Sequence, residues 1–77
     1  MLEFTYQGER YFANVIEYRH SPAVFYVNLI NAPSNKPRKL ILEEVNGRIS
    51  LSRNSQPANS EFVAIIGKKI GEYLEAN

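Results

Sequence analysis

The sequence predicts an α+β fold, an antiparallel meander of about five strands with one C-terminal helix packed on one face. Three observations carry this prediction. Apolar and polar residues alternate over much of the first fifty residues, an Asn46-Gly47 pair separates two such runs, and the apolar spacing becomes helical near residue 60. The expected strands are 2–6, 10–20, 24–31, 39–45 and 48–53, and the expected helix is 60–76. A chain of 77 residues makes a single α+β domain, 1–77.

The first two strands are expected to form a hairpin across Gln7-Gly8. With these residues as a two-residue turn, Phe4 opposes Tyr11 and Leu2 opposes Ala13. The inner face of the second strand then carries Tyr11, Ala13 and Val15.

The sequence leaves two alternatives for which side chains of the second strand point to the core after Val15. Continued alternation turns Asn14 outward but aims Glu17 at the core. The opposite phase, with Phe12, Ile16 and Tyr18 inside, would bury Asn14 without a partner, at a cost of about 1 to 3 kcal/mol. A β-bulge near Ile16 reconciles the two phases, because one extra residue switches the face of every later side chain.

A short connection at Ser21-Pro22-Ala23 leads into the third strand, since proline fixes φ and lacks a backbone donor. The inward side chains of this strand are Phe25, Val27 and Leu29. The segment 31–37, rich in proline and asparagine, is expected to be a loop.

Asn46-Gly47 predicts the hairpin between the last two strands, because a type I′ turn needs positive φ at both central residues. In this register Glu44 opposes Ile49 and Leu42 opposes Leu51. Four apolar side chains then share the inner face: Leu40, Leu42, Ile49 and Leu51. Ser50 and Ser52 are expected on the outer face.

The helix is expected to begin with Ser60 as N-cap and Glu61 in its first turn. Its apolar face consists of Phe62, Ile65, Ile66, Ile70, Tyr73 and Leu74. A neighbouring stripe of small residues holds Ala64, Gly67 and Gly71. Each glycine costs a helix interior about 1 kcal/mol relative to alanine, so we expect this stripe to pack closely against the sheet.

Composition excludes several classes of site. The chain has no cysteine and a single histidine, which rules out disulfides, thiolate nucleophiles and Cys/His zinc sites, and no cofactor is expected. The net charge of +1 is too small to attract nucleic acid or anionic lipid from a distance. The amino terminus lacks a signal-peptide pattern and no apolar run approaches a membrane span, so we expect a cytoplasmic protein without a membrane partner.

No group of residues has the pattern of an active site. Glu43 and Glu44 are adjacent in a strand and point to opposite faces, so they cannot share a proton or a metal. His20 has no identifiable nucleophile or orienting group beside it. The glycines are scattered and form no phosphate-binding loop. We therefore expect that the chain is not an enzyme.

The uncovered face of the sheet is the candidate binding face. The residues expected on it or beside it are Tyr18, His20, Tyr26, Asn28, Lys36, Arg38, Lys39 and Arg48. An exposed apolar band of Phe12, Ile16, Tyr18, Tyr26 and Ile41 fits a protein partner or a homodimer. Aromatic rings flanked by cations also fit single-stranded nucleic acid, whose bases stack on such rings. Tyrosine is also common in strands because it suits a half-exposed pleated surface.

The order of strands followed by one helix resembles the architecture of single-strand nucleic-acid-binding modules such as Pur-type repeats and Whirly proteins. The resemblance is one of topology and implies no residue roles. The sequence therefore predicts a small non-catalytic binding module whose uncovered sheet face takes a protein partner or a second copy of the chain. The alternative is weak, sequence-tolerant binding of single-stranded nucleic acid by the same face.

Overall fold

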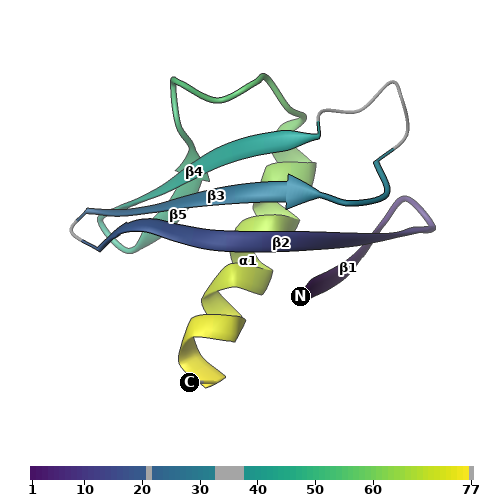
Figure 1. Ribbon diagram of the computed structural model, residues 1–77, viewed down its shortest axis with the longest axis horizontal. Helices are drawn as coiled ribbons and strands as arrows, with labels where there is room; N and C mark the ends of the chain where they lie inside the picture. The colour runs from purple at the N-terminus through teal and green to yellow at the C-terminus, as the bar shows by residue number, and fades with distance from the viewer. Residues whose placement is uncertain (21, 33–37, 77) are drawn as a thin grey trace.

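The computed structural model describes residues 1–20, 22–32 and 38–76, without the side chains of His20, Glu75 and Ala76. Its strands form one antiparallel sheet in the order β1-β2-β3-β4-β5, and α1 lies behind the sheet in the view of Figure 1. The elements are β1 (Leu2–Tyr6), β2 (Glu9–His20), β3 (Ala23–Leu29), β4 (Lys39–Val45), β5 (Arg48–Leu51) and α1 (Ser60–Ala76). The predicted α+β meander is confirmed.

Both tight hairpins have the predicted two-residue turns. Gln7 and Gly8 have φ values of 51° and 78°, and Asn46 and Gly47 have values of 53° and 80°. Positive φ at both central residues defines the type I′ turn, whose twist matches that of the flanking strands. The resulting registers are the expected ones in both hairpins, with Phe4 opposite Tyr11 and Leu42 opposite Leu51.

A β-bulge in β2 resolves the ambiguity after Val15. Ile16 pairs with Tyr26 and Glu17 with Phe25, but the next pair joins Arg19 to Val24, so Tyr18 is the extra residue. The first phase therefore holds through Glu17, and the bulge lies slightly beyond the expected position near Ile16. Glu17 stays exposed although it pairs with the buried Phe25.

Strand β3 ends at Leu29, two residues before the expected end at 31, because the side chain of Asn31 takes over the pairing with β2. Asn31 Oδ1 accepts a hydrogen bond from the Phe12 amide, and Asn31 Nδ2 donates one to the Arg10 carbonyl, both at 3.0 Å. A side-chain amide thus reproduces the donor and acceptor that a strand residue would offer.

Strand β5 ends at Leu51 rather than at 53. The Ser52 amide still donates to the Ile41 carbonyl at 2.8 Å, but the chain then turns, and the Asn54 and Ser55 amides donate to Ser52 Oγ and to its carbonyl. The Ile41 amide donates instead to Ser55 Oγ, at 2.9 Å. Ser52 is buried beneath this turn and lines a hollow of the outer face of the sheet, on which it was expected.

Helix α1 is capped by Asn59, not by Ser60 as expected. Asn59 Oδ1 accepts a hydrogen bond of 2.8 Å from the Glu61 amide, and the Asn59 carbonyl accepts the first helical bond from the Val63 amide at 3.0 Å. Asparagine is as good an N-cap as serine, because its short side-chain oxygen reaches a free first-turn amide.

The hydrophobic core lies between α1 and the inner face of the sheet. Its buried residues are Phe4, Tyr6, Tyr11, Ala13, Phe25, Val27, Leu29, Leu40, Leu42, Phe62, Val63, Ile66 and Ile70. Phe62 anchors the helix, since its ring meets the rings of Phe4, Tyr6 and Tyr11 edge-on at 5.0 to 5.5 Å between centroids.

The last turns of α1 extend beyond β2, toward the C-terminus in Figure 1. Tyr73 and Leu74, which the periodicity placed in the apolar face of the helix, are therefore exposed. The apolar spacing of the helix continues past the point where the sheet ends, so the apolar side chains of its last turn have no core to pack against.

Candidate binding face

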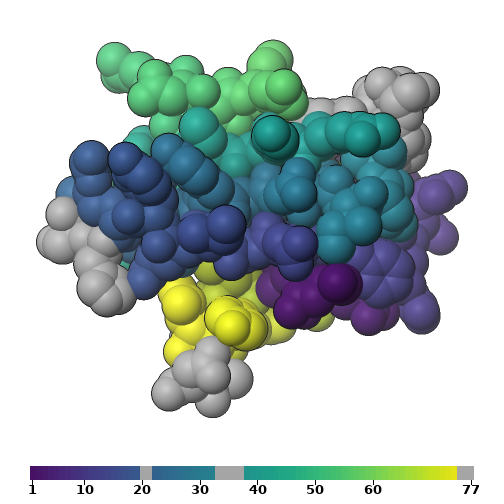
Figure 2. Space-filling model, in the orientation of Figure 1, coloured from purple at the N-terminus to yellow at the C-terminus, as the bar shows by residue number. Residues whose placement is uncertain are grey.

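The face of the sheet opposite α1 is called the outer face here, and it is built from three rows of residues that cross β2, β3 and β4. The central row is Ile16, Tyr26 and Ile41; one flanking row is Asn14, Asn28 and Lys39; the other is Arg19, Val24 and Glu43. Figure 2 shows this face, on which the side chains of β2, β3 and β4 lie with no other described element over them.

The centre of the outer face is apolar and exposed. Ile16 retains 64% of its accessible surface, Tyr18 58% and Tyr26 41%. The two tyrosine rings stack on each other, with centroids 4.9 Å apart and planes at 16°. Tyr18, the extra residue of the bulge, lies on the face that alternation from Ile16 predicts for it, which is also the face of Tyr26.

Two shallow hollows lie beside Tyr26. The first is lined by Ile16, Tyr26, Asn28, Lys39 and Ile41. The second is lined on the opposite flank by Tyr18, Arg19, Val24, Glu43, Ser52 and Asn54, with Tyr26 and Ile41 between. The outer face is therefore uneven, with an aromatic stack standing next to a mostly apolar depression.

The structure brings together only part of the candidate set from the sequence. Tyr18, Tyr26, Asn28 and Lys39 lie on the outer face as described above. Arg38 is exposed just before β4, where its carbonyl accepts a hydrogen bond of 2.7 Å from the Leu29 amide.

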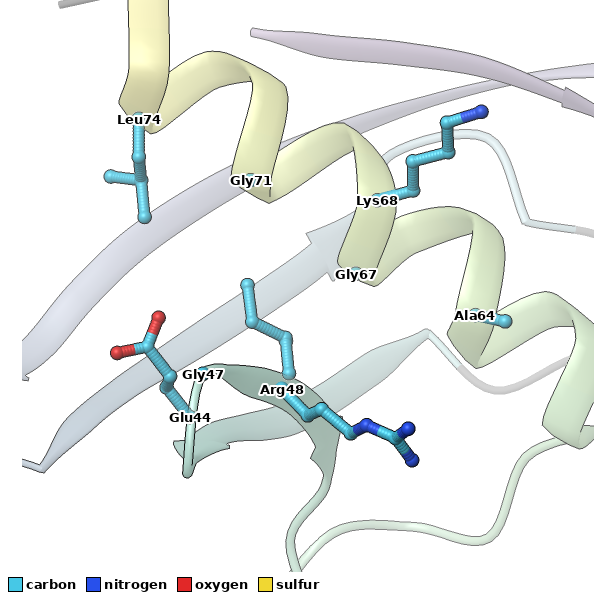
Figure 3. A pocket seen from close by; sticks show the side chains of 9 residues that line it. Glu44, Gly47, Arg48, Ala64, Gly67, Lys68, Gly71 and Leu74 are labelled. Carbon is cyan, nitrogen blue, oxygen red and sulfur yellow. The ribbon is translucent and has the colours of Figure 1, made fainter.

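Arg48 lies away from the central row. It is the first residue of β5, pairs with Val45 beside the Asn46-Gly47 turn, and directs its side chain away from the helix in Figure 3. Lys36 and the side chain of His20 lie outside the described part of the chain.

Two residues of the outer face were missed as binding candidates. Arg19 reaches this face only because of the bulge, which the alternation of the sequence does not locate. Glu43 was considered only as half of an acidic pair, yet its pairing with Val24 places it on the outer face. The alternation that places Ile41 on the outer face also places Glu43 there, because the two residues are two positions apart in β4.

A further hollow, of about 480 Å³, opens between α1 and the β4–β5 hairpin (Figure 3). Gly67 is buried at its edge, where an added Cβ would lie 3.2 Å from the Ile49 carbonyl oxygen, but a Cβ on Gly71 would meet nothing within 4 Å. The expected close packing of the small stripe is therefore correct at Gly67 and wrong at Gly71. Ala64 is exposed.

The described residues contain no group of three or more histidine, aspartate or glutamate side chains placed to hold a metal ion. Glu43 and Glu44 line different hollows, on the outer face and beside α1, as their adjacent positions in β4 require. Within the described ranges, no helix has the length and apolar character needed to cross a membrane.

No protein-family model, curated protein or solved structure matches this chain. Function is therefore inferred from the geometry of the outer face.

Proposed function

We propose that this chain is a small non-catalytic binding module and that its outer face binds a protein. The observation that carries the proposal is the contiguous exposure of Ile16, Tyr18 and Tyr26 at the centre of a face that no described element covers. Exposed apolar patches with a polar rim mark interaction sites, and tyrosine is enriched at the centre of such sites.

The polar rim is present on both flanks of the patch. Asn14, Asn28 and Lys39 border it on one side, and Arg19 and Glu43 on the other. The stacked pair of tyrosines is held in one arrangement before a partner arrives, so binding immobilises few additional rotamers.

The test is affinity capture from a cell extract with the wild-type chain and with Ile16→Glu. Because Ile16 is exposed and outside the core, this variant should fold normally but place a charge at the centre of the patch. Leu74→Glu is the matched control, since Leu74 is an exposed apolar residue on α1. Proteins retained by the wild type and Leu74→Glu but lost by Ile16→Glu are the expected result. Equal retention by all three chains, from a wild type that is also monomeric in solution, would contradict the proposal.

Single-stranded nucleic acid is the second candidate, favoured by the Tyr18–Tyr26 stack between the cations Arg19 and Lys39. It is less well supported because Glu43 lies on the same face and because each tyrosine already uses one ring face on the other. An NMR titration with a mixed-sequence oligonucleotide at low and moderate salt separates the two. Salt-sensitive shifts at these residues would favour nucleic acid, since phosphate binding weakens steeply with ionic strength.

A further inference from the structure

We propose that the protein bound by the outer face is a second copy of this chain, packed face to face about a two-fold axis. This inference rests on the proposed function, because it names the partner of the same surface. The reason is that the charges of the outer face are complementary to themselves.

Opposite charges flank Ile41, the residue that β4 contributes to the central row. Lys39 and Glu43 lie two positions on either side of Ile41 and share its face. A two-fold axis along the central row exchanges the two flanks, so Lys39 of each copy faces Glu43 of the other. Asn14 of each copy then faces Arg19 of the other, which pairs an amide oxygen with a guanidinium.

An axis along the strands gives the other possible two-fold arrangement, and it also pairs unlike groups. It keeps each flank in place but exchanges β2 with β4, so that Glu43 faces Arg19 of the second copy. In both arrangements Glu43 meets a base, and the central row packs against its own copy. Isologous packing requires this kind of self-complementary surface.

The hollows of the face accommodate one of the two tyrosines. Tyr26 lies in the middle of the central row, so either axis packs it against Tyr26 of the other copy, whereas Tyr18 lies off that row, and hollows lie on both of its flanks. The axis along the central row carries Tyr18 of one copy toward the hollow on the Asn28 flank of the other. The axis along the strands carries it toward the hollow on the Glu43 flank.

The size of the face sets the expected affinity. Three strands about 4.8 Å apart give a patch narrower than the 32 × 27 Å extents of the molecule, and a narrow patch suits a weak contact rather than a permanent one. The net charge of +1 adds little repulsion between copies. We therefore expect a weak dimer, with a dissociation constant on the order of 100 µM.

The experiment is sedimentation equilibrium of the whole chain from about 10 µM to about 1 mM, with variants that reverse single charges. The wild type should pass from the 8.8 kDa monomer to twice that mass. Glu43→Lys, Lys39→Glu and Arg19→Glu each place like charges in contact in one or both arrangements. Glu43→Lys should weaken dimerisation at least about tenfold, because it removes the pair in either arrangement.

Mixing distinguishes the arrangements. Glu43→Lys mixed with Lys39→Glu restores both pairs in a heterodimer if the axis follows the central row, and Glu43→Lys mixed with Arg19→Glu restores them if the axis follows the strands. Glu44→Lys and Lys68→Glu are matched controls, since both residues line the hollow beside α1, and they should dimerise as the wild type does.

Recovery of a dimer in either mixture supports the proposal. A wild type that stays monomeric throughout the concentration range overturns it, as does a dimer that responds to the controls but not to Glu43→Lys. If the chain is monomeric while capture of other proteins still depends on Ile16, the proposed function survives with a different partner. If capture also fails to depend on Ile16, both proposals fall.

Discussion

Two glycines one turn apart in α1 should respond in opposite ways to the same substitution. Gly67→Ala and Gly71→Ala both remove the conformational cost of a helical glycine, a gain of about 0.8 to 1.0 kcal/mol each. At Gly71 the new methyl group meets nothing within 4 Å, so most of the gain should appear as stability.

At Gly67 the methyl group meets β5. It would lie 3.2 Å from the Ile49 carbonyl oxygen and 3.4 and 3.5 Å from Ile49 Cβ and Cγ2. Relief requires either the helix or the strand backbone to shift by a few tenths of an ångström, and overpacking of this kind costs about 1 to 3 kcal/mol. Gly67→Ala should therefore be neutral to destabilising, and the two variants should differ by at least about 1 kcal/mol.

Thermal unfolding followed by circular dichroism measures this difference. For a domain of this size, 1 kcal/mol corresponds to about 4 to 8 °C in Tm. Gly71→Ala should unfold above the wild type, and Gly67→Ala at or below it. Equal stabilisation by both substitutions would refute the close approach of α1 to β5 at Ile49.

Three further predictions can be tested by denaturant or thermal unfolding. Phe62→Ala should destabilise the fold by about 3 to 5 kcal/mol, because it empties the centre of the aromatic cluster, and a loss below 1 kcal/mol would contradict that placement. Asn59→Ala should cost about 1 kcal/mol while Ser60→Ala costs a few tenths at most; the reverse order would restore Ser60 as the cap. Gln7→Asn should raise stability by about 0.5 kcal/mol, since Asn tolerates the positive φ of 51° better than Gln, and an unchanged Tm would argue against the type I′ turn.

Much of the architecture is encoded locally and was predicted on that basis. The turn at Asn46-Gly47 and the alternation of apolar residues around it specify the register between β4 and β5. The turn at Gln7-Gly8 does the same for β1 and β2, although Gln is less typical of that position. These features depend on dihedral preferences and on a period of two, which neighbouring residues carry.

The ends of elements were predicted less well, because they depend on contacts between distant residues. Asn31 ends β3 by bonding to Phe12, 19 positions away, and Ser55 captures the amide of Ile41, 14 positions away. The cap at Asn59 differs by one residue from the expected one because serine and asparagine are equivalent by propensity, and only the geometry of entry into α1 chooses between them.

The candidate binding face was predicted in part for the same reason. Tyr26, Asn28 and Lys39 follow from simple alternation along β3 and β4. Arg19 does not, because one bulge residue changes the facing of the end of β2, and the packing of the whole sheet determines where that residue is inserted. Arg48 has the expected exposure but lies near the turn, away from the central row.

The sequence by itself therefore determined the periods, the two-residue turns and the identity of most core residues, because these depend on interactions within a few positions. Ile16, Tyr18 and Tyr26 stay outside the core, as the alternation predicts. Only the tertiary structure decided how much of the helix the sheet covers. The helix ends beyond the sheet, so Tyr73 and Leu74 are exposed although the helical period places them in the apolar face. Gly67 and Gly71 are alike in sequence context. Only the place where α1 touches β5 decides that Gly67 packs against Ile49 while Gly71 faces open space.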